Sequence, residues 1–398
     1  MSTTRFPRTA TTSAARTGPT AHTEKFDPTR GDGRMELVDL VGKVEVKAII
    51  ASKSIEFLAT GDTGRGLHTE QETVVDAMAR DVDVHKPAAG PTFLCHLGDI
   101  IYGPDKSPNY ANKFYRPNQA WLQPAEGFKG IILGIPGNHD GELRDPRDIK
   151  SLNAFLENFC TAHPPMAASF NAVMPNQPGP YWFLDAPFLD LIGLYSNADE
   201  NIGVLGADAA DTKQRVWLES MLRLVAAARK KGERKALVIV THHPPYSQGL
   251  HATGSGHPGS PAMLAEIDAA CQAAGVWPDL FLSGHAHNYQ RYMRTLKLAG
   301  GQTKVIPYLV VGTGGYGSQP VPANLGSVVE DARGSVKYAN ARGAEGRGAD
   351  FYGYVRIHAS AKVIQATMVQ TIEDHRNELE TVAIDLVTGQ ETKPEFEV

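Results

Sequence analysis

The feature of this 398-residue sequence that most constrains its fold is a pattern that recurs five times. In each case a short apolar run ends abruptly at polar residues able to bind metal, often behind a glycine. The five junctions read GDTG, GDIIY, GNHD, HHPP and GHAH. Each indicates a buried strand that ends in a functional loop. Because such loops converge outside the carboxyl ends of the strands in layered α/β folds, five of them can build one site.

The N-terminal segment differs in composition from the rest of the chain. We expect residues 1–35 to form a disordered N-terminal tail and residues 36–398 to form a single catalytic domain, with compact structure starting near Met35. The first 23 residues of the tail contain three arginines, many Ser and Thr residues and no acid. An organelle transit peptide has the same composition, so that alternative stays open. The first 23 residues show no apolar region typical of a secretory signal, and no apolar stretch approaches the roughly 20 residues needed to cross a bilayer. We expect a cytoplasmic protein, with an exported form as the alternative.

Composition excludes some classes of partner and cofactor. A formal net charge of -5, with no run of basic residues, argues against a nucleic acid polymer as partner. The three cysteines are distant from one another and odd in number, which indicates neither a disulfide framework nor a CxxC metal site. Cys95, inside the apolar run TFLCHL, is expected to be a small buried hydrophobe.

Local patterns predict further elements. VEVKAII, at residues 44–50, alternates like a half-buried strand. Residues 214–231 carry apolar side chains at helical spacing and end in cations, and another helix is expected to stop at Gly275. The long segments 104–129 and 319–350 are predicted to be lids or rims that shape specificity. The turn at 312–317 lacks the lysine of a P-loop and is interpreted as scaffold.

Taken singly, the five motifs are weak signals. An aspartate such as Asp62 or Asp99 after a strand is usually part of a turn or a helix cap. His285 and His287 are more informative, because two imidazoles at this spacing can point into one pocket. Taken in order, with the helix QRVWLESML between the third and fourth motifs, they resemble the purple acid phosphatases within the calcineurin-like metallophosphoesterases. The resemblance spans Phe57 to Arg291.

This resemblance implies a fold and an activity. The fold would be a four-layer metallophosphoesterase sandwich, α/β in class, with two mixed β-sheets packed face to face and flanked by helices. The activity would be hydrolysis of small phosphate monoesters by a metal-activated hydroxide at a dinuclear centre of iron plus a divalent metal. A phosphodiesterase acting on nucleotides or phospholipid head groups is the nearest alternative, and a non-catalytic binding protein is a third. Substrate identity and oligomeric state stay open.

The resemblance also implies a ligand set. It assigns Fe(III) to Asp62, Asp99, Tyr102 and His287. It assigns the second ion, which would be Fe(II), Zn or Mn, to Asp99, Asn138, His242 and His285. The fourth motif offers two histidines: a His-x-Pro alignment selects His242, which we prefer, and a Val-x-x-His alignment selects His243. These oxygen and imidazole ligands suit Fe, Mn or Zn.

Gly64 and Tyr102 depart together from the commoner metallophosphoesterase pattern. Relatives outside the purple group carry a histidine where this chain has Gly64, and Tyr102 would replace that imidazole. A tyrosine has an ordinary pKa of about 10. Phenolate ligation at neutral pH therefore requires a strongly acidic ion, which favours ferric iron at this position.

The remaining site residues are expected from the resemblance to contact substrate. His139 matches a histidine that hydrogen-bonds phosphate or protonates the leaving group, and is the predicted catalytic residue. Asp140 either orients His139 or caps the next element. The predicted substrate-binding residues are His243, His251 and His257, and for the last two a surface loop with incidental histidines is an equal alternative.

Overall fold

The computed structural model describes most of the chain from residue 31 onward. The described residues are 31–66, 70–82, 90–103, 107–124, 130–141, 152–196, 203–206, 212–248, 257–319, 328–331, 333–339, 351–372 and 375–396. The predicted N-terminal tail therefore lies almost wholly outside them, as does His251.

One of two sheets is built mainly from the second half of the chain. Its strands are β1 (Arg34–Glu36), β5 (Trp182–Ala186), β6 (Leu189–Gly193), β7 (Ala236–Thr241), β8 (Leu280–Ser283), β9 (Tyr289–Lys297), β10 (Thr303–Val311), β11 (Val328–Asp331) and β12 (Gly334–Tyr338). They lie in the order β1-β5-β6-β7-β8-β10-β9-β12-β11. Strands β6, β7, β8 and β10 are parallel, so their carboxyl ends meet at one edge.

The other sheet joins early strands to the C-terminal ones. Its strands are β2 (Ser54–Thr60), β3 (Leu94–His96), β4 (Ile132–Gly134), β13 (Tyr352–Ser360), β14 (Val363–Ile372), β15 (His375–Asp385) and β16 (Glu391–Thr392). The order is β16-β15-β14-β13-β2-β3-β4, with β2, β3 and β4 parallel. The first three polar loops therefore also emerge at a common edge.

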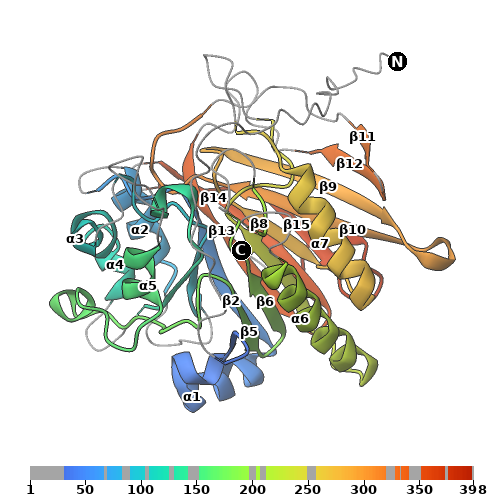
Figure 1. Cartoon of the computed structure of the whole chain (residues 1–398), viewed down its shortest axis with the longest axis horizontal. Coiled ribbons are helices and arrows are strands. Elements are labelled where there is room, and N and C mark those ends of the chain that lie inside the picture. The colour runs from blue at the N-terminus through green and yellow to red at the C-terminus, as the bar shows by residue number, and fades with distance from the viewer. Residues whose placement is uncertain are drawn as a thin grey trace.

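The helices cover the outer faces of the two sheets. In Figure 1 the yellow-green helix α6 and the golden helix α7 lie side by side over one sheet, and α2 to α5 cover the other. A buried cluster containing Phe57, Leu97, Val240 and Leu282 fills the space between the sheets. The predicted four-layer sandwich is thus confirmed. The helices are α1 (Leu37–Ser52), α2 (Glu70–Ala79), α3 (Ser107–Tyr110), a π-helix (Ala111–Tyr115), α4 (Gln119–Leu122), α5 (Asn153–Phe159), α6 (Lys213–Lys230) and α7 (Pro261–Ala274).

The strand predicted at residues 44–50 is wrong, because this segment lies inside α1. Val46 and Ile49, three residues apart, pack on the core, whereas Val44 is 84% exposed and Ile50 is 54% exposed. Burial therefore follows the helical repeat rather than the alternation. Gly42 interrupts the helix with a φ of 83°.

The other two helix predictions are confirmed. Helix α6 buries Leu218, Leu222 and Val225, although Val216, at the start of the predicted apolar face, is exposed. Helix α7 ends at Gly275, whose φ of 70° is the left-handed conformation that glycine adopts at helix ends. Cys95 is fully buried, as expected.

The first of the two predicted lid segments is instead part of the packed interior. Its described residues form α3, the π-helix and α4, and they bury Tyr110, Phe114 and Trp121 in one aromatic cluster with Phe159 of α5. Burial of these bulky aromatic side chains stabilises helical structure here, although the Pro and Gly content of the segment indicated a loop. The described part of the second segment contributes β12 and, at the edge of the sheet, β11.

Candidate metal centre

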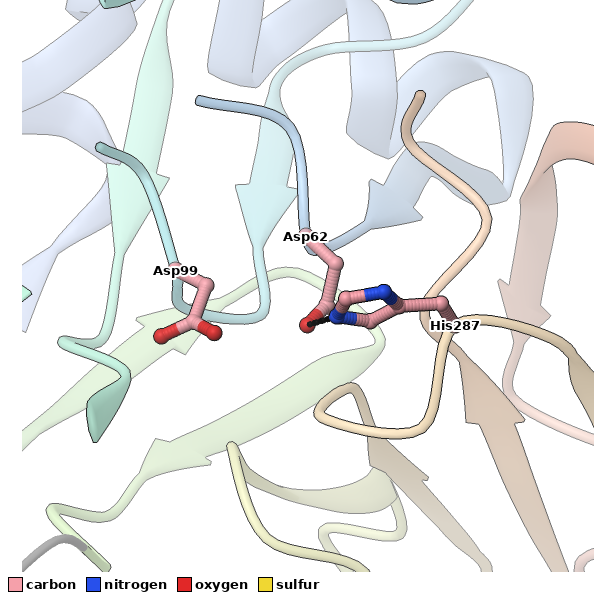
Figure 2. Close-up of side chains that lie close together, drawn as sticks. All are labelled: Asp62, Asp99 and His287. Atoms are coloured by element: carbon pink, nitrogen blue, oxygen red, sulfur yellow. Dashed lines mark ion pairs between the residues drawn. The ribbon is translucent and has the colours of Figure 1, made fainter. Parts of the chain in front are cut away.

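All seven predicted metal ligands lie together at the carboxyl edge of the two sheets. They stand in the loops after β2, β3, β4, β7 and β8. Figure 2 shows three of them, Asp62, Asp99 and His287, approaching one another from three separate loops. One ligand atom from each lies within 4.8 Å of the other two, an arrangement that can hold a metal ion. The convergence expected from parallel strand ends is thus present.

The first group of donor atoms centres on Tyr102. The Tyr102 hydroxyl lies 3.1 Å from Nε2 of His287 and 3.4 Å from Oδ1 of Asp62. Nε2 of His287 is 3.5 Å from that same carboxylate oxygen. The backbone N–H of His285 donates to Oδ2 of Asp62 at 2.9 Å, which leaves Oδ1 directed at the tyrosine and the imidazole.

The second group centres on the amide oxygen of Asn138. Nε2 of His242 lies 3.0 Å from this oxygen, and Nδ1 of His285 lies 2.9 Å from it. The two imidazole nitrogens are 3.3 Å apart, and Oδ1 of Asp99 is 3.4 Å from Nε2 of His242. A carboxylate oxygen of Asp99 also lies within 4.8 Å of ligand atoms of Asp62 and His287 in the first group. Its carboxylate therefore lies between the two groups.

These separations fit donors that share first-row metal ions. Bonds of about 2.0 to 2.2 Å to one ion hold its oxygen and nitrogen ligands about 3.0 to 3.4 Å apart. Within the two groups, the donor atoms lie 2.9 to 3.5 Å apart. The chemistry also fits, because carboxylate, amide, phenol and imidazole donors suit Fe, Mn or Zn. The residues present can therefore hold two ions.

Burial controls the protonation of the imidazoles. Burial, reinforced by neighbouring histidines, depresses the pKa of His285 well below its ordinary value, and burial likewise lowers the pKa of His287 to about 3. Burial also acts against a charged His242, but the Asp99 and Asp62 carboxylates outweigh it and raise the pKa of His242 to about 9. Two of the three imidazoles are therefore neutral, as metal ligation requires, and the third carries the positive charge that the carboxylates demand.

The surroundings shift the pKa values of the acidic groups of the site in opposite directions. Burial and the adjacent Asp99 carboxylate raise the pKa of Asp62 to about 8. Burial raises the pKa of Asp99 too, but the charge of His242 more than offsets this and holds it well below the ordinary range. Burial and both carboxylates raise the pKa of the Tyr102 phenol well above 10. Deprotonating Tyr102 therefore requires a strong positive charge in direct contact.

The backbone of the site is strained. Asp62, Asp99 and His285 adopt φ values of 60°, 53° and 68°, in the left-handed region that non-glycine residues avoid. Each such residue costs roughly 1 kcal/mol or more, and such strain gathers at functional sites. Three of the predicted ligands are thus held in place against a local conformational preference.

Close backbone contact explains the glycine at position 64. A Cβ atom there would lie 2.6 Å from Cα of Ile101 and 2.8 Å from the carbonyl oxygen of Ile100. Gly64 and Ile101 also form a parallel β-bridge. No histidine fits at this position, and the contact brings the Tyr102 loop alongside the Asp62 loop.

The histidines predicted to contact substrate lie at different depths. The His139 ring is 4.5 Å from that of Tyr102, and its backbone N–H donates to Asp99 at 2.9 Å. Nδ1 of His257 is 2.9 Å from Nε2 of His285, so this loop residue reaches the centre. His243 is buried beneath His285, with Nδ1 3.1 Å from the Ser196 hydroxyl. A substrate contact for each remains a prediction.

Three contributors were not predicted from the sequence. Tyr316 stacks on Tyr102, with ring centroids 3.3 Å apart and planes within 3°. The Gln319 backbone N–H donates to the carbonyl of His287 at 2.8 Å. Ser196 contacts His243, as described above. Tyr316 lies in the turn interpreted as scaffold, and the turn is scaffold in that its backbone binds that of Gly61 and Asp62.

Asp140 has a role different from either expectation. Its buried carboxylate accepts hydrogen bonds from the backbone N–H groups of Ile100, Ile101 and Gly137. It therefore ties the loop after β3 to the loop after β4, rather than capping a helix or orienting His139. Both loops carry predicted ligands, so Asp140 fixes their relative position.

The chain is an α/β sandwich of two packed sheets. Carboxylates and imidazoles suited to metal binding lie together at the ends of its strands. A family model for calcineurin-like phosphoesterases matches residues 55–289, more than half of the chain. The chain belongs to this family. Membership supports metal-dependent hydrolysis of phosphoric esters, with a small phosphorylated substrate, as its activity.

Solved structures share the fold at low sequence identity. GAP50, the anchor in the inner membrane complex of Plasmodium, is 14% identical with a TM-score of 0.52, over 82% of this chain and 88% of that one. PhoD is 13% identical with a TM-score of 0.51, over 86% of this chain and 72% of that one. A search of curated proteins finds no match. Among the described residues, no helix is long and apolar enough to span a membrane.

Proposed function

We propose that this chain is a phosphomonoesterase of the purple acid phosphatase type, with ferric iron and a second ion, Fe(II), Zn or Mn, in one dinuclear centre. The observation that carries the proposal is the position of the Tyr102 hydroxyl, 3.1 Å from Nε2 of His287 and 3.4 Å from Asp62. The Tyr102 hydroxyl would supply the ligand atom that a histidine at position 64 supplies in the commoner pattern. A phenol in a ligand set favours Fe(III), since only a strongly acidic ion displaces its proton at neutral pH.

The proposed ligands divide between two ions that share Asp99. When bound, such ions lower the pKa of water and neutralise the charge of phosphoryl oxygens. The protein orients the donors. Nδ1 of His242 donates to the Leu97 carbonyl at 2.9 Å, which fixes the tautomer with Nε2 as ligand atom. The ligands of the ferric ion would be Asp62, Asp99, Tyr102 and His287, and those of the second ion Asp99, Asn138, His242 and His285.

Two half-buried histidines at the centre are proposed to act on the substrate. His139 stands beside Tyr102, where its ring can hydrogen-bond a phosphate oxygen or give a proton to the leaving alcohol. His257 is held against His285 at 2.9 Å and would contact the phosphate from the opposite loop. His243 and His251 are kept as proposed substrate contacts, although the burial of His243 favours support of His285.

Assays on aryl phosphate and bis-aryl phosphate separate the two esterase functions. The purified protein would be stripped of metal and then supplied with Fe, Mn or Zn, singly and in pairs. We expect cleavage of the monoester, highest with iron present. Preferential cleavage of the diester would instead select the phosphodiesterase alternative, and no cleavage of either ester with any metal would refute both.

Asp99→Asn tests whether the shared carboxylate is catalytic. The change keeps side-chain volume but weakens both groups of ligands, so we expect loss of hydrolysis without unfolding. Asp76→Asn, at an exposed position on α2, is the matched control and should retain activity. A folded Asp99→Asn protein with full activity would contradict the metal assignment.

A further inference from the structure

A cavity of about 280 Å³ lies near the metal centre. Its walls include three tyrosines, Tyr246, Tyr292 and Tyr338, together with Val336 and Gln248. We call it the tyrosine cavity. An apolar cavity of roughly 150 Å³ is enough to hold benzene, so this one admits a group of about two fused rings.

The tyrosine cavity and the metal centre share the connection between β7 and α7. Its first part carries His242 into the centre and Gln248 into the cavity wall, and its last part carries His257 and then Gly259. The two parts are joined by an antiparallel β-bridge between Gln248 and Pro258. A molecule held at His257 therefore has the cavity wall beginning two residues away along the chain.

Gln290, on β9, also links the tyrosine cavity to the metal centre. Its side-chain oxygen accepts hydrogen bonds from the Gln248 backbone and the Tyr292 hydroxyl, at 2.8 Å and 2.6 Å. Its amide nitrogen donates at 2.8 Å to Asn288, the neighbour of His287. The cavity wall is thus fixed to the loop that carries two proposed metal ligands.

Among the described residues that line it, the tyrosine cavity offers no cation to a second anionic group. Arg294, behind the wall, donates to Asp331 at 2.8 Å and to Asp268 through two bonds of 2.8 and 2.6 Å. Tyr246 also donates to Asp331, at 2.9 Å. Because the arginine is fully paired and the carboxylate lines the cavity, a diphosphate or other polyanion is disfavoured.

One polar atom of the wall lacks a partner. Among the described residues, the side-chain oxygen of Gln248 is buried and accepts no hydrogen bond. An unsatisfied buried acceptor costs about 1 to 3 kcal/mol. A rotation of the Gln248 side chain would turn this oxygen toward a hydroxyl or N–H donor of a ligand in the cavity, and that hydrogen bond would remove the cost.

We propose that the tyrosine cavity binds the alcohol portion of the substrate, and that the substrate is a phosphate monoester of an uncharged aromatic alcohol bearing a second hydrogen-bond donor. The aromatic walls stack on the ring, Gln248 accepts from the donor, and the phosphate lies at the metal centre. This inference rests on the proposed phosphomonoesterase function, and it adds the substrate class.

Filling the cavity tests the inference. Val336→Phe places an aromatic ring in the cavity, and Val328→Phe, at an exposed position on the adjacent strand β11, is the matched control. For naphthyl phosphate we expect kcat/KM to fall at least tenfold in Val336→Phe, chiefly through KM. For methyl phosphate, which does not reach the cavity, we expect values within twofold of the wild type. Equal losses on both esters, or no loss on either, would overturn the inference.

Gln248→Leu tests the hydrogen bond separately. The wild type should prefer a naphthyl phosphate bearing a second hydroxyl over plain naphthyl phosphate by about fivefold or more, and the variant should lose this preference. A preference that survives in Gln248→Leu contradicts the role of this acceptor. This variant also serves if Val336→Phe fails to fold.

Binding without catalysis separates the two proposals. Titration of dihydroxynaphthalene into the metal-free protein, followed by calorimetry, should show one site that Val336→Phe removes. If this site is present but no ester is cleaved, the phosphomonoesterase function fails and the cavity assignment stands. If esters are cleaved but dihydroxynaphthalene does not bind, the cavity assignment fails alone.

Discussion

His242 and Asn138 face each other across 3.0 Å through two atoms that both accept hydrogen bonds. The Leu97 carbonyl can only accept, so the hydrogen of His242 lies on Nδ1 and a lone pair on Nε2 points at the amide oxygen. Nδ1 of His285 approaches the same oxygen at 2.9 Å. The lone pairs of His242 Nε2 and Asn138 Oδ1 repel each other in this buried place unless a positive charge lies between them. A metal ion supplies it, and without metal a proton on His242 does.

This relationship predicts how the stability of the metal-free protein depends on pH. The pKa of His242 is about 9 in the folded chain, against about 6.5 when unfolded. The folded state thus holds an extra proton between these values, and its contribution, fully present below pH 6.5, is lost as pH rises through 9. We expect the free energy of unfolding to fall by about 3 kcal/mol across this window.

Thermal unfolding between pH 6 and 10, with and without metal, checks this prediction. Bound metal replaces the proton, so the metal-loaded protein should lack the decline, and His242→Gln should lack it without metal. A metal-free wild type of constant melting temperature over this range would contradict the protonated state of His242.

The two histidines of the fourth motif should differ in their effect on metal content. His242→Ala removes a proposed ligand, so we expect loss of one metal equivalent and a fall in kcat of at least about a hundredfold. His243→Ala removes a buried ring that contacts Ser196, and both ions should stay. Elemental analysis of the two purified variants measures the difference. Equal metal loss in both would mean that the choice between His242 and His243 is wrong.

The sequence predicts that these side chains lie together because they follow strands. Each apolar run ends within a few residues of a polar side chain, and parallel pairing then brings Asp62, Asp99 and Asn138 to one edge. Tyr316 could not be found in this way. It stacks on Tyr102 from 214 residues further along the chain, and a contact at that separation leaves no local sequence pattern.

Local alternation was misleading in α1 for a related reason. Val44, Val46 and Ile50 mimic one face of a strand, but the segment precedes β2 and packs across the core as a helix. Propensity of short apolar runs does not separate strand from helix, and tertiary packing decides. In the same way, the prolines and glycines of residues 104–129 indicated a lid, whereas burial of the aromatic side chains within 107–122 makes this part a set of packed short helices.

Gly64→Ala tests the contact that replaces a histidine with a tyrosine. The added methyl would meet Ile101 backbone at 2.6 Å, which cannot be relieved by a side-chain rotation. We expect destabilisation of about 2 kcal/mol or more and weaker metal binding as the Tyr102 loop shifts. Gly300→Ala, which meets no atom within 4 Å, should cost only about 1 kcal/mol of left-handed strain. Equal unfolding curves for both variants would contradict the close packing of these loops.

The central claim is that Tyr102 binds ferric iron, and a visible spectrum of the iron-loaded protein tests it most directly. The wild type should show a tyrosinate-to-iron charge-transfer band. Tyr102→Phe should abolish the band, while Tyr316→Phe, which retains an aromatic ring against Tyr102, should keep it. Iron content measured on the same samples separates loss of the band from loss of the ion. Iron-loaded wild-type protein without the band, or a band that persists in Tyr102→Phe, would contradict the claim.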